Sequence, residues 1–295
     1  MKVRVPGKDT DENEIFQILE QEIMTTEDYE KICEMGFETF YNEDYLKRIC
    51  DLTPEEISST MESLMTTGAN YLKGLNERNI DTLFLAHGNH PFFTLSLMRS
   101  LIPFTNDLYY NPDPVEKTLR QMTDELIAKE LPTAISGKDL GIKGWLFTEE
   151  RASGYHYPPS IFERFWWPYT KEIVDAFWSE GIVTIFHLDT CWDKNLHYFK
   201  ELPKGSAVIG LDSTTDIILA KEILGGHLCI YGDIPAAMLS HGKPEEVEAY
   251  CKKLIDEVGR GGGFILGSGC AVPPDCKPDN FQMMLETAKH YEFSM

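Results

Sequence analysis

Three side chains that can bind a transition metal lie within five residues near the middle of the sequence. His187, Asp189 and Cys191 follow the apolar run at residues 183–186, which has no helical period and is typical of a buried strand. Imidazole, carboxylate and thiolate are donors that zinc accepts, and a strand end spreads them into a concave space. The spacing fits a metal site and fits equally well a buried histidine paired with a structural acid.

A second strand end with a potential ligand lies far downstream, in residues 261–274, GGGFILGSGCAVPP. The short apolar strand at residues 264–266 ends in a turn that places Cys270 between glycines and prolines. Two strand ends would then direct a thiol and an imidazole at one place. The alternative is that Cys270 is an inert, buried small hydrophobic residue.

Composition restricts the class of protein and its partners. The chain has 295 residues, a length that fits one large α/β domain or two small ones, and its formal net charge is −21. Such a charge disfavours nucleic acid and anionic membranes as partners, because no basic run offsets it. No apolar stretch approaches the roughly 20 residues of a membrane span, and residues 1–10 are too polar for a signal peptide. A cytoplasmic protein is expected.

The seven cysteines do not form the pattern of a disulfide framework, because their number is odd and the chain is long. There is no CxxC pair, so any metal site must mix donor types. We expect four of the cysteines to be structural, on helices or inside a strand: Cys33, Cys50, Cys229 and Cys251.

The N-terminal part, residues 1–79, is predicted to form a hairpin and acidic helices that pack on a catalytic portion at residues 80–295. The hairpin would pair residues 3–5 with residues 16–19. A helix is predicted over residues 54–76, with Thr53 as its N-cap and Pro54 at its first position. Its apolar stripe is interpreted as core-packing and comprises Ile57, Met61, Leu64, Met65, Tyr71, Leu72 and Leu75.

From residue 80 onward, short apolar strands alternate with amphipathic helices. Strands are predicted at residues 82–86, 143–147, 182–186, 207–211, 227–231 and 264–266. The helices between and after them are predicted up to residue 98, at 160–179, near 198, and at 216–224, 235–239, 244–258 and 279–290. This alternation indicates βα units with parallel strands. Because every strand end carries His, Glu, Asp or Cys, we predict an α/β fold of the (β/α)8 TIM-barrel type rather than a doubly wound sheet.

Several blocks resemble the uroporphyrinogen decarboxylase superfamily, and more closely its cobalamin-dependent methyltransferase branch. The blocks are WLFTEERASG at residues 145–154, FHLDTC at 186–191, GLD at 210–212, GDIP at 232–235 and GGGFILGSGCAVP at 261–273. The resemblance covers residues 80–291. The family's barrel has two strands ahead of the first one predicted here, so the resemblance implies a barrel that is incomplete at its N-terminal side. The open edge would be covered by the hairpin and acidic helices or by a second subunit, which would make the protein a homo-oligomer.

The resemblance implies a zinc site formed by His187, Asp189 and Cys270. Asp189 stands where the coenzyme M branch has a cysteine, and Cys191 is its rival as a ligand. A carboxylate in place of a thiolate makes the zinc more Lewis-acidic, which favours an oxygen-bound methyl donor over a thiol. Asp212 matches an acidic residue that can occupy the open zinc position.

The implied activity is zinc-dependent transfer of a methyl group between a small methylated substrate and a corrinoid protein. Cobalamin is expected on that separate partner, because the chain has no Asp-x-His-x-x-Gly motif. Catalytic roles are expected for Glu149 and Asp233 at the substrate oxygen, although helix capping or a turn hydrogen bond is an equally good explanation for each acid. The residues expected to line the substrate pocket are His87, His90, Tyr155 and Asp212.

Three alternative functions stay open. A uroporphyrinogen decarboxylase-like lyase needs arginines to hold its acidic substrate, and this chain has few. A non-catalytic barrel remnant that acts as a binding subunit would explain the short N-terminal part. A zinc hydrolase would need the same ligands and a general base such as Glu150.

Overall fold

Strands that follow one another in the sequence also follow one another in the principal sheet. The computed structural model describes residues 2–12, 14, 17–49, 53–84 and 87–292, and its six-stranded sheet has the order β3-β4-β5-β6-β7-β8. The strands are β3 (His87–Asn89), β4 (Gly144–Glu149), β5 (Val183–Leu188), β6 (Ala207–Leu211), β7 (Cys229–Ile234) and β8 (Phe264–Ser268). The pairings from β5 to β8 are all parallel. The α/β fold of the barrel type predicted from the sequence is confirmed, and its principal sheet has six strands among the described residues.

The chain folds as two compact units, and the boundary between them divides β4 after Leu146. The first unit comprises Met1–Val3, Ile18–Leu146 and Glu163–Ile182, and the second comprises Arg4–Gln17, Phe147–Phe162 and Val183–Met295. Neither unit ends at the boundary predicted between residues 79 and 80. Strands β5 to β8 lie wholly in the second unit, so the candidate metal ligands belong to it.

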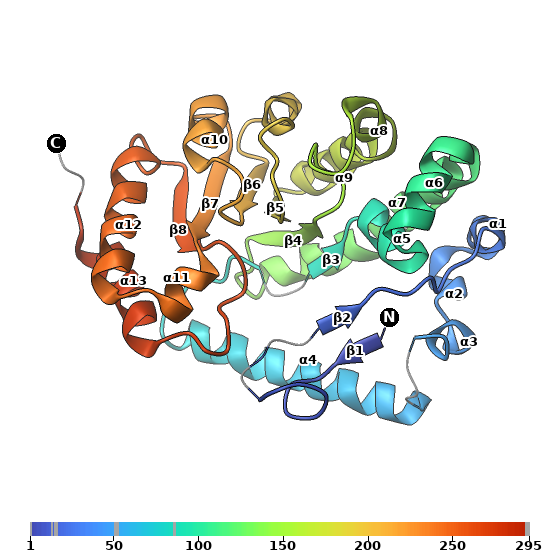
Figure 1. Cartoon of the computed structure of the whole chain (residues 1–295), viewed down its shortest axis with the longest axis horizontal. Helices are drawn as coiled ribbons and strands as arrows, with labels where there is room; N and C mark the ends of the chain where they lie inside the picture. Colours follow the sequence, from blue (N-terminus) through green and yellow to red (C-terminus); the bar gives the residue numbers. More distant parts are fainter. Residues whose placement is uncertain (1, 13, 15–16, 50–52, 85–86, 293–295) are drawn as a thin grey trace. The chain divides into compact units, whose positions relative to one another are not determined.

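In the second unit, helices cover strands whose side chains are apolar on both faces. All five residues of β6 are buried, which is typical of a parallel strand covered on both sides. Helices α10 and α12 pack on β7, and α12 also packs on β8 and on α13 (Figure 1). The helical segments of this unit are η1 (Leu196–Glu201), α10 (Ile217–Leu224), α11 (Ala236–His241), α12 (Pro244–Glu257) and α13 (Pro278–His290).

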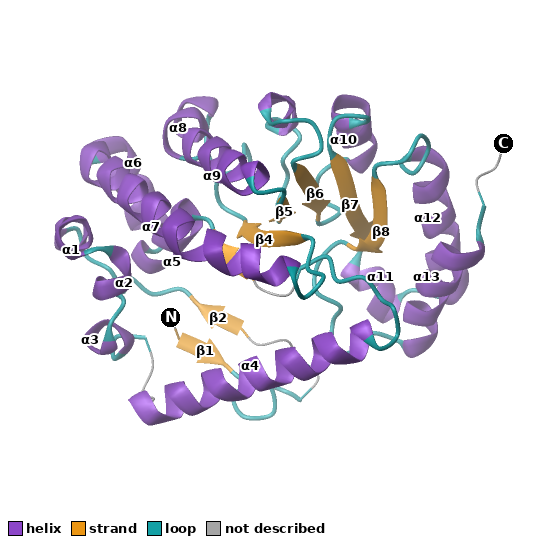
Figure 2. Cartoon of the chain, turned by 180° about the vertical axis from the view of Figure 1, so that it is seen from behind, coloured by secondary structure: helices purple, strands orange, loops and turns teal. Residues whose placement is uncertain are grey.

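The first unit is largely helical. Its helices are α1 (Glu27–Met35), α2 (Phe37–Phe40), α3 (Glu43–Leu46), α4 (Pro54–Asn76), α5 (Pro91–Arg99), α6 (Leu101–Tyr110), α7 (Pro112–Lys138) and α9 (Trp167–Ser179). Helix α7 packs against α1, α5, α6 and α9 (Figure 2). The predicted N-terminal hairpin is present as the paired strands β1 (Lys2–Arg4) and β2 (Gln17–Leu19).

Four strands extend beyond their predicted ends. β4, β5, β7 and β8 run two or three residues further, and for β7 and β8 backbone pairing continues through the polar ends, as in Asp233↔Gly267. His187 and Asp233 therefore lie inside strands and not in the loops that follow them. The strand predicted at residues 82–86 is wrong in position: β3 begins at His87, and Thr82 makes only an isolated bridge with Ile142.

Two helix predictions also need correction. The helix predicted over residues 160–179 is divided into α8 (Pro159–Phe165) and α9, whose first turn contains Pro168, a residue without an N–H to continue the helix. The apolar stripe of α4 does not form core as a whole: Leu72 is buried, whereas Met61, Leu64, Met65 and Tyr71 are exposed.

The cysteines predicted to be structural lie on regular elements where they are described. Cys33 is on α1, Cys229 is on β7 and Cys251 is buried on α12. Cys50 lies outside the described residues.

Candidate metal centre

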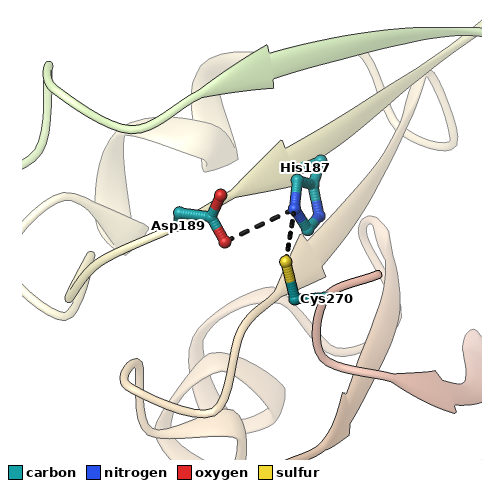
Figure 3. A group of neighbouring side chains, drawn as sticks. All are labelled: His187, Asp189 and Cys270. Carbon is teal, nitrogen blue, oxygen red and sulfur yellow. Dashed lines mark hydrogen bonds and ion pairs between the residues drawn. The ribbon is translucent and has the colours of Figure 1, made fainter. Parts of the chain in front are cut away.

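His187, Asp189 and Cys270 offer one ligand atom each, and these three atoms lie within 4.8 Å of one another. His187 Nε2 is 3.3 Å from Asp189 Oδ1 and 3.6 Å from Cys270 Sγ (Figure 3). The imidazole and the carboxylate come from the end of β5, and the thiol comes from the loop after β8. The structure thus brings together the three side chains that the sequence had indicated as metal ligands.

The local backbone explains why Asp189 and not Cys191 faces His187. Residues 187, 189 and 191 would point to one side of a continuous strand, but β5 ends at Leu188 and Thr190 adopts a left-handed φ of 68°. This conformation breaks the alternation after Asp189. Within the described part of the chain, Cys191 is not among the donors that converge.

Asp212, at the end of β6, stabilises this unusual conformation of Thr190. Its Oδ2 accepts a hydrogen bond of 2.9 Å from the Thr190 N–H, while its Oδ1 accepts from the N–H and hydroxyl of Thr214. The Thr190 hydroxyl in turn donates to the Glu150 carbonyl at 3.0 Å. The loops after β4, β5 and β6 are therefore fixed to one another next to the candidate metal ligands.

Glycines let the Cys270 loop approach the end of β6. A Cβ on Gly269 would lie 3.0 Å from the backbone carbonyl carbon of Asp212, and the Gly269 N–H donates to the Ile234 carbonyl at 2.9 Å. A Cβ on Gly267 would clash with the ring of Tyr231. Close backbone packing, which larger residues would prevent, sets the position of Cys270.

The environment of His187 strongly favours its protonated form when no metal is bound. Hydrogen bonding to Asp189, then to Cys270, raises the pKa of His187 to about 10, against the effect of burial. Two acceptor groups that converge on one ring nitrogen would be satisfied equally by a cation in the place of the proton.

The donor set fits zinc, and so do the two distances from His187. A tetrahedral zinc site with nitrogen, oxygen and sulfur ligands has ligand-to-ligand distances of roughly 3.3 to 3.7 Å. The two distances from His187 Nε2, 3.3 Å and 3.6 Å, fall in that range. Three protein ligands leave the fourth position for a substrate, which is the arrangement of catalytic rather than structural zinc.

Glu149 is a fully buried carboxylate at the end of β4. Its Oε1 accepts hydrogen bonds from the backbone N–H groups of Glu150, Arg151 and Ala152, at 2.9 to 3.2 Å. The Glu149 carbonyl accepts from the Asp189 N–H at 3.1 Å. Glu149 therefore orders the loop after β4 and is bound through its backbone to the loop that carries a candidate ligand.

Asp233 is buried on β7 and is paired with an aromatic hydroxyl. The Tyr250 hydroxyl donates a hydrogen bond of 2.8 Å to Asp233 Oδ1. Burial raises the pKa of Asp233, and the bond from Tyr250 opposes that rise. A carboxyl with a raised pKa keeps its proton to higher pH than an exposed one does, which suits a role in proton transfer.

Of the two histidines predicted to line the substrate pocket, the structure describes the side chain of His90 only. His90 is buried in the first unit, where its Nδ1 accepts from the Phe92 N–H at 3.2 Å and its Nε2 lies 3.2 Å from the Thr170 hydroxyl. Both ring nitrogens thus have partners in the helical core, which leaves none for a substrate. For His87 the structure describes the backbone, in β3.

Tyr155 lines a cavity of about 380 Å³ in the second unit, and its side chain is 72% exposed. The cavity is formed by the loop after β4 and by the chain that follows Trp192, including Lys194 and Asn195. The Asn195 side chain accepts a hydrogen bond of 2.7 Å from the Gly154 N–H and so joins the two segments.

Sequence reasoning missed two residues that act on the predicted site. Thr190 sets the direction of Asp189 through its left-handed backbone conformation, and Tyr250 donates a hydrogen bond to Asp233. A threonine between two candidate ligands gives no indication of a left-handed conformation. The pairing of Tyr250 with Asp233 joins a helix to a strand and has no local sequence signal.

The fold and the ligand arrangement define an α/β protein of the barrel type with a candidate metal centre at the carboxyl ends of its strands. The chain belongs to the uroporphyrinogen decarboxylase (URO-D) family, whose model matches residues 88–291. Among the described residues, none of the helices has both the length and the apolar character needed to cross a membrane.

The relatives that match this chain include proteins named as methyltransferases and proteins named as decarboxylases. The methylcobamide:CoM methyltransferase MtbA of Methanosarcina mazei is 31% identical over 133 residues, which are 45% of this chain and 38% of that protein. The uroporphyrinogen decarboxylase of Methylococcus capsulatus is 33% identical over 90 residues, 30% of this chain and 25% of that protein. The chain therefore spans well under half the length of these two relatives.

A solved structure of a methyltransferase from Methanosarcina mazei has the same fold. It superposes with a TM-score of 0.58 and 17% sequence identity, covering 69% of this chain and 58% of that one.

Proposed function

We propose that this chain is a zinc-dependent methyltransferase that moves a methyl group between a small methylated compound and a corrinoid protein. The observation that carries this proposal is the convergence of His187, Asp189 and Cys270 within 4.8 Å. The similarity to the MtbA proteins supports the reaction class. An O-methyl compound is the proposed substrate type.

The choice of an oxygen-bound methyl group rests on Asp189. Zinc, when bound, supplies Lewis acidity. A carboxylate ligand donates less electron density to the metal than a thiolate does, so it leaves zinc more Lewis-acidic. His187 and Cys270 complete the protein's share of the ligands and leave one position open for the substrate oxygen.

The chain's own carboxyl groups have distinct roles in this proposal. Asp233, whose pKa is raised by burial, supplies a proton to the substrate oxygen as the methyl group leaves it. Glu149 positions the loop after β4 through three hydrogen bonds. Asp212 keeps the Asp189 loop in place, and Tyr155 contributes to the substrate pocket.

The corrinoid is proposed to arrive on a partner protein that docks at the carboxyl ends of the strands, because its cobalt must come within transfer distance of the methyl group. Tyr155, which is 72% exposed, offers an apolar contact there. With a net charge of −21, docking to an acidic partner depends on such apolar contacts rather than on charge attraction.

The test combines metal analysis with methyl transfer. We expect one zinc per chain in the purified protein, and loss of both zinc and methyl transfer to a corrinoid protein in His187→Ala. His197→Ala is the matched control, because His197 lies on η1, outside the convergent group. Unchanged turnover in His187→Ala, or a protein that transfers methyl groups without metal, would contradict the proposal.

A decarboxylase is the second candidate, and the relatives named uroporphyrinogen decarboxylase favour it. Such a reaction requires no metal ligands. Release of CO2 from a porphyrinogen by protein that has been treated with a chelator would select it over methyl transfer.

A further inference from the structure

The cavity that Tyr155 lines differs from the rest of the chain in charge. It is called the β4-loop cavity below and is formed by residues 154–159 together with Lys194 and Asn195. Aspartate and glutamate make up 48 of the 295 residues, yet none of the described residues that line this cavity is an acid. Two other cavities do contain acids, namely Asp113 and Glu116 in one and Glu248 and Glu286 in the other. A cavity with a lysine and without acids, in a chain of net charge −21, favours an anionic ligand.

Lys194 can pair with such an anion. Among the described residues, no carboxylate forms a salt bridge with its ammonium group. Its aliphatic stem lies against Gly154, where an added Cβ would be 3.0 Å from Lys194 Cβ and 3.2 Å from Lys194 Cδ. The stem is therefore held beside the cavity, while the ammonium group stays free for a ligand.

His156 contributes a polar atom that the protein leaves without a partner. Its Nε2 is buried and forms no hydrogen bond with the described residues. Burial, and then the charge of Arg151, lowers the pKa of His156, so its imidazole is neutral near pH 7 and Nε2 can donate or accept. A buried polar atom without a hydrogen bond is unfavourable, and a polar group of a ligand in the cavity would supply the missing partner.

The aromatic side chains of the cavity are arranged to receive a planar ring. The rings of Tyr155 and His156 are nearly perpendicular, at 84°, with their centroids 5.0 Å apart. Two perpendicular rings present a face and an edge to a third ring, which are the two favoured contacts between aromatic groups. Pro158 and Pro159 add apolar walls.

The size of the cavity restricts the ligand to a small molecule. Its volume of about 380 Å³ lies at the lower end of the range of small-molecule sites, roughly 300 to 1,000 Å³. A compound with one ring fits this space, whereas a corrin macrocycle is too large.

The cavity wall is joined to the segment that carries a candidate metal ligand. Asn195 Oδ1 accepts a hydrogen bond of 2.7 Å from the Gly154 N–H. The hydroxyl groups of Ser153 and Thr190 are 2.9 Å apart, and Thr190 directly follows Asp189. These bonds hold the cavity in one shape and connect its wall to the Asp189 loop.

We infer that the β4-loop cavity binds a small aromatic carboxylate, with the ring against Tyr155 and His156 and the carboxylate at Lys194. This names the chemical class of the methylated compound, and in that respect the inference rests on the proposed function. The binding itself requires neither metal nor corrinoid.

Calorimetric titration of the full chain with 4-hydroxybenzoate tests the site. We expect saturable binding to one site with a Kd between about 10 μM and 1 mM, which is ordinary for a ligand of this size. The neutral analogue 4-hydroxybenzamide should bind roughly tenfold more weakly, because it cannot form the charge-assisted hydrogen bond with Lys194. The compound trans-4-hydroxycyclohexanecarboxylate has the charge without the aromatic ring and should also bind more weakly.

Two variants assign the binding to this cavity. Lys194→Met keeps the apolar stem and removes the charge, so it should weaken 4-hydroxybenzoate roughly tenfold and 4-hydroxybenzamide little. His156→Phe keeps a ring and removes Nε2, so it should weaken both ligands while the ligand-free protein keeps or gains thermal stability. Lys200→Met and His197→Phe are the matched controls, because both residues lie on η1 at exposed positions outside the cavity lining, and they should leave binding unchanged.

Absence of binding up to about 10 mM, or an affinity that neither Lys194→Met nor His156→Phe changes, would overturn the inference. Equal binding of the acid and the amide would exclude an anionic ligand, and equal binding of the aromatic and the cyclohexane compounds would exclude the aromatic class.

Methyl transfer from 4-methoxybenzoate to a corrinoid protein separates this inference from the proposed function. Binding in the cavity without any transfer would support the site and count against the methyltransferase. Transfer from another O-methyl compound, by a protein that does not bind the aromatic acid, would overturn the site alone.

Discussion

The carboxylate of Asp212 accepts a hydrogen bond of 2.9 Å from the backbone N–H of Thr190, the residue that follows the candidate ligand Asp189. Thr190 has a left-handed φ of 68°, which is unfavourable for a β-branched residue unless surrounding contacts hold it. The bond across from β6 therefore determines which side chain of the HLDTC segment reaches His187. Asp212 is best understood as a positioning residue for the metal ligands.

Asp212→Asn should lower zinc affinity by roughly 10- to 100-fold, as the loss of a supporting contact behind a ligand usually does. The amide cannot accept all the bonds from Thr190 and Thr214 that the carboxylate accepts. Competition with a chromogenic chelator measures the affinity. Asp193→Asn is the control, because Asp193 accepts a similar bond from the Asp216 N–H in the same loop. Equal affinity in both variants would contradict this role.

Asp189→Cys should keep the metal and change the substrate preference. A thiolate in this position makes zinc less Lewis-acidic, so transfer from an O-methyl compound should fall relative to reaction with a thiol. Zinc affinity should rise, on the order of tenfold. Methyl transfer with the two substrate types, measured side by side, checks the shift. Cys191→Ser should leave zinc content as in the unchanged protein, and loss of zinc there would mean that Cys191 is the ligand after all.

His90 should make the protein less stable in acid. Burial lowers the pKa of His90 from 6.5 to about 3, so between these values the unfolded chain binds a proton that the folded chain does not. Its contribution to stability is complete above pH 6.5 and falls by about 2 kcal/mol on acidification to pH 5.

Urea unfolding of His90→Asn at several pH values measures this effect, because asparagine can still cap α5 but does not titrate. The pH dependence between 5 and 6.5 should become shallower than in the unchanged protein. His290→Asn, at an exposed position, should alter nothing in that range. An identical slope in His90→Asn would show that His90 is not responsible.

Tyr250→Phe should raise the pKa of Asp233 further, since the lost hydrogen bond favours the ionised carboxylate. If Asp233 gives a proton to the leaving oxygen, activity falls where Asp233 loses that proton, so the alkaline limb of the pH–rate profile should move to higher pH. The stability difference between the variant and the unchanged protein should grow as pH rises and Asp233 must ionise without its partner, reaching about 1 kcal/mol. Tyr291→Phe removes a similar bond, to Asp256, far from the site and should not move the profile.

The sequence by itself determined the order of the elements and the types of donor. Apolar runs such as residues 183–186 and 207–211 predict buried parallel strands because their side chains suit a sheet covered on both faces, and the structure has β5 and β6 there. The residues at the strand ends could be identified because parallel strands bring their carboxyl ends to one edge.

The tertiary structure decided which of those residues meet and which face of a helix is buried. Asp189 rather than Cys191 lies beside His187 because a hydrogen bond from Asp212, distant in sequence, holds Thr190 in a left-handed conformation. His90 became a core residue because Thr170 lies against its ring. The apolar stripe of α4 predicts burial but does not specify against what, and the chain itself covers Leu72 while it leaves Leu64 and Met65 exposed. Local sequence sets a side chain's direction and polarity, whereas its partners depend on contacts between segments that are far apart along the chain.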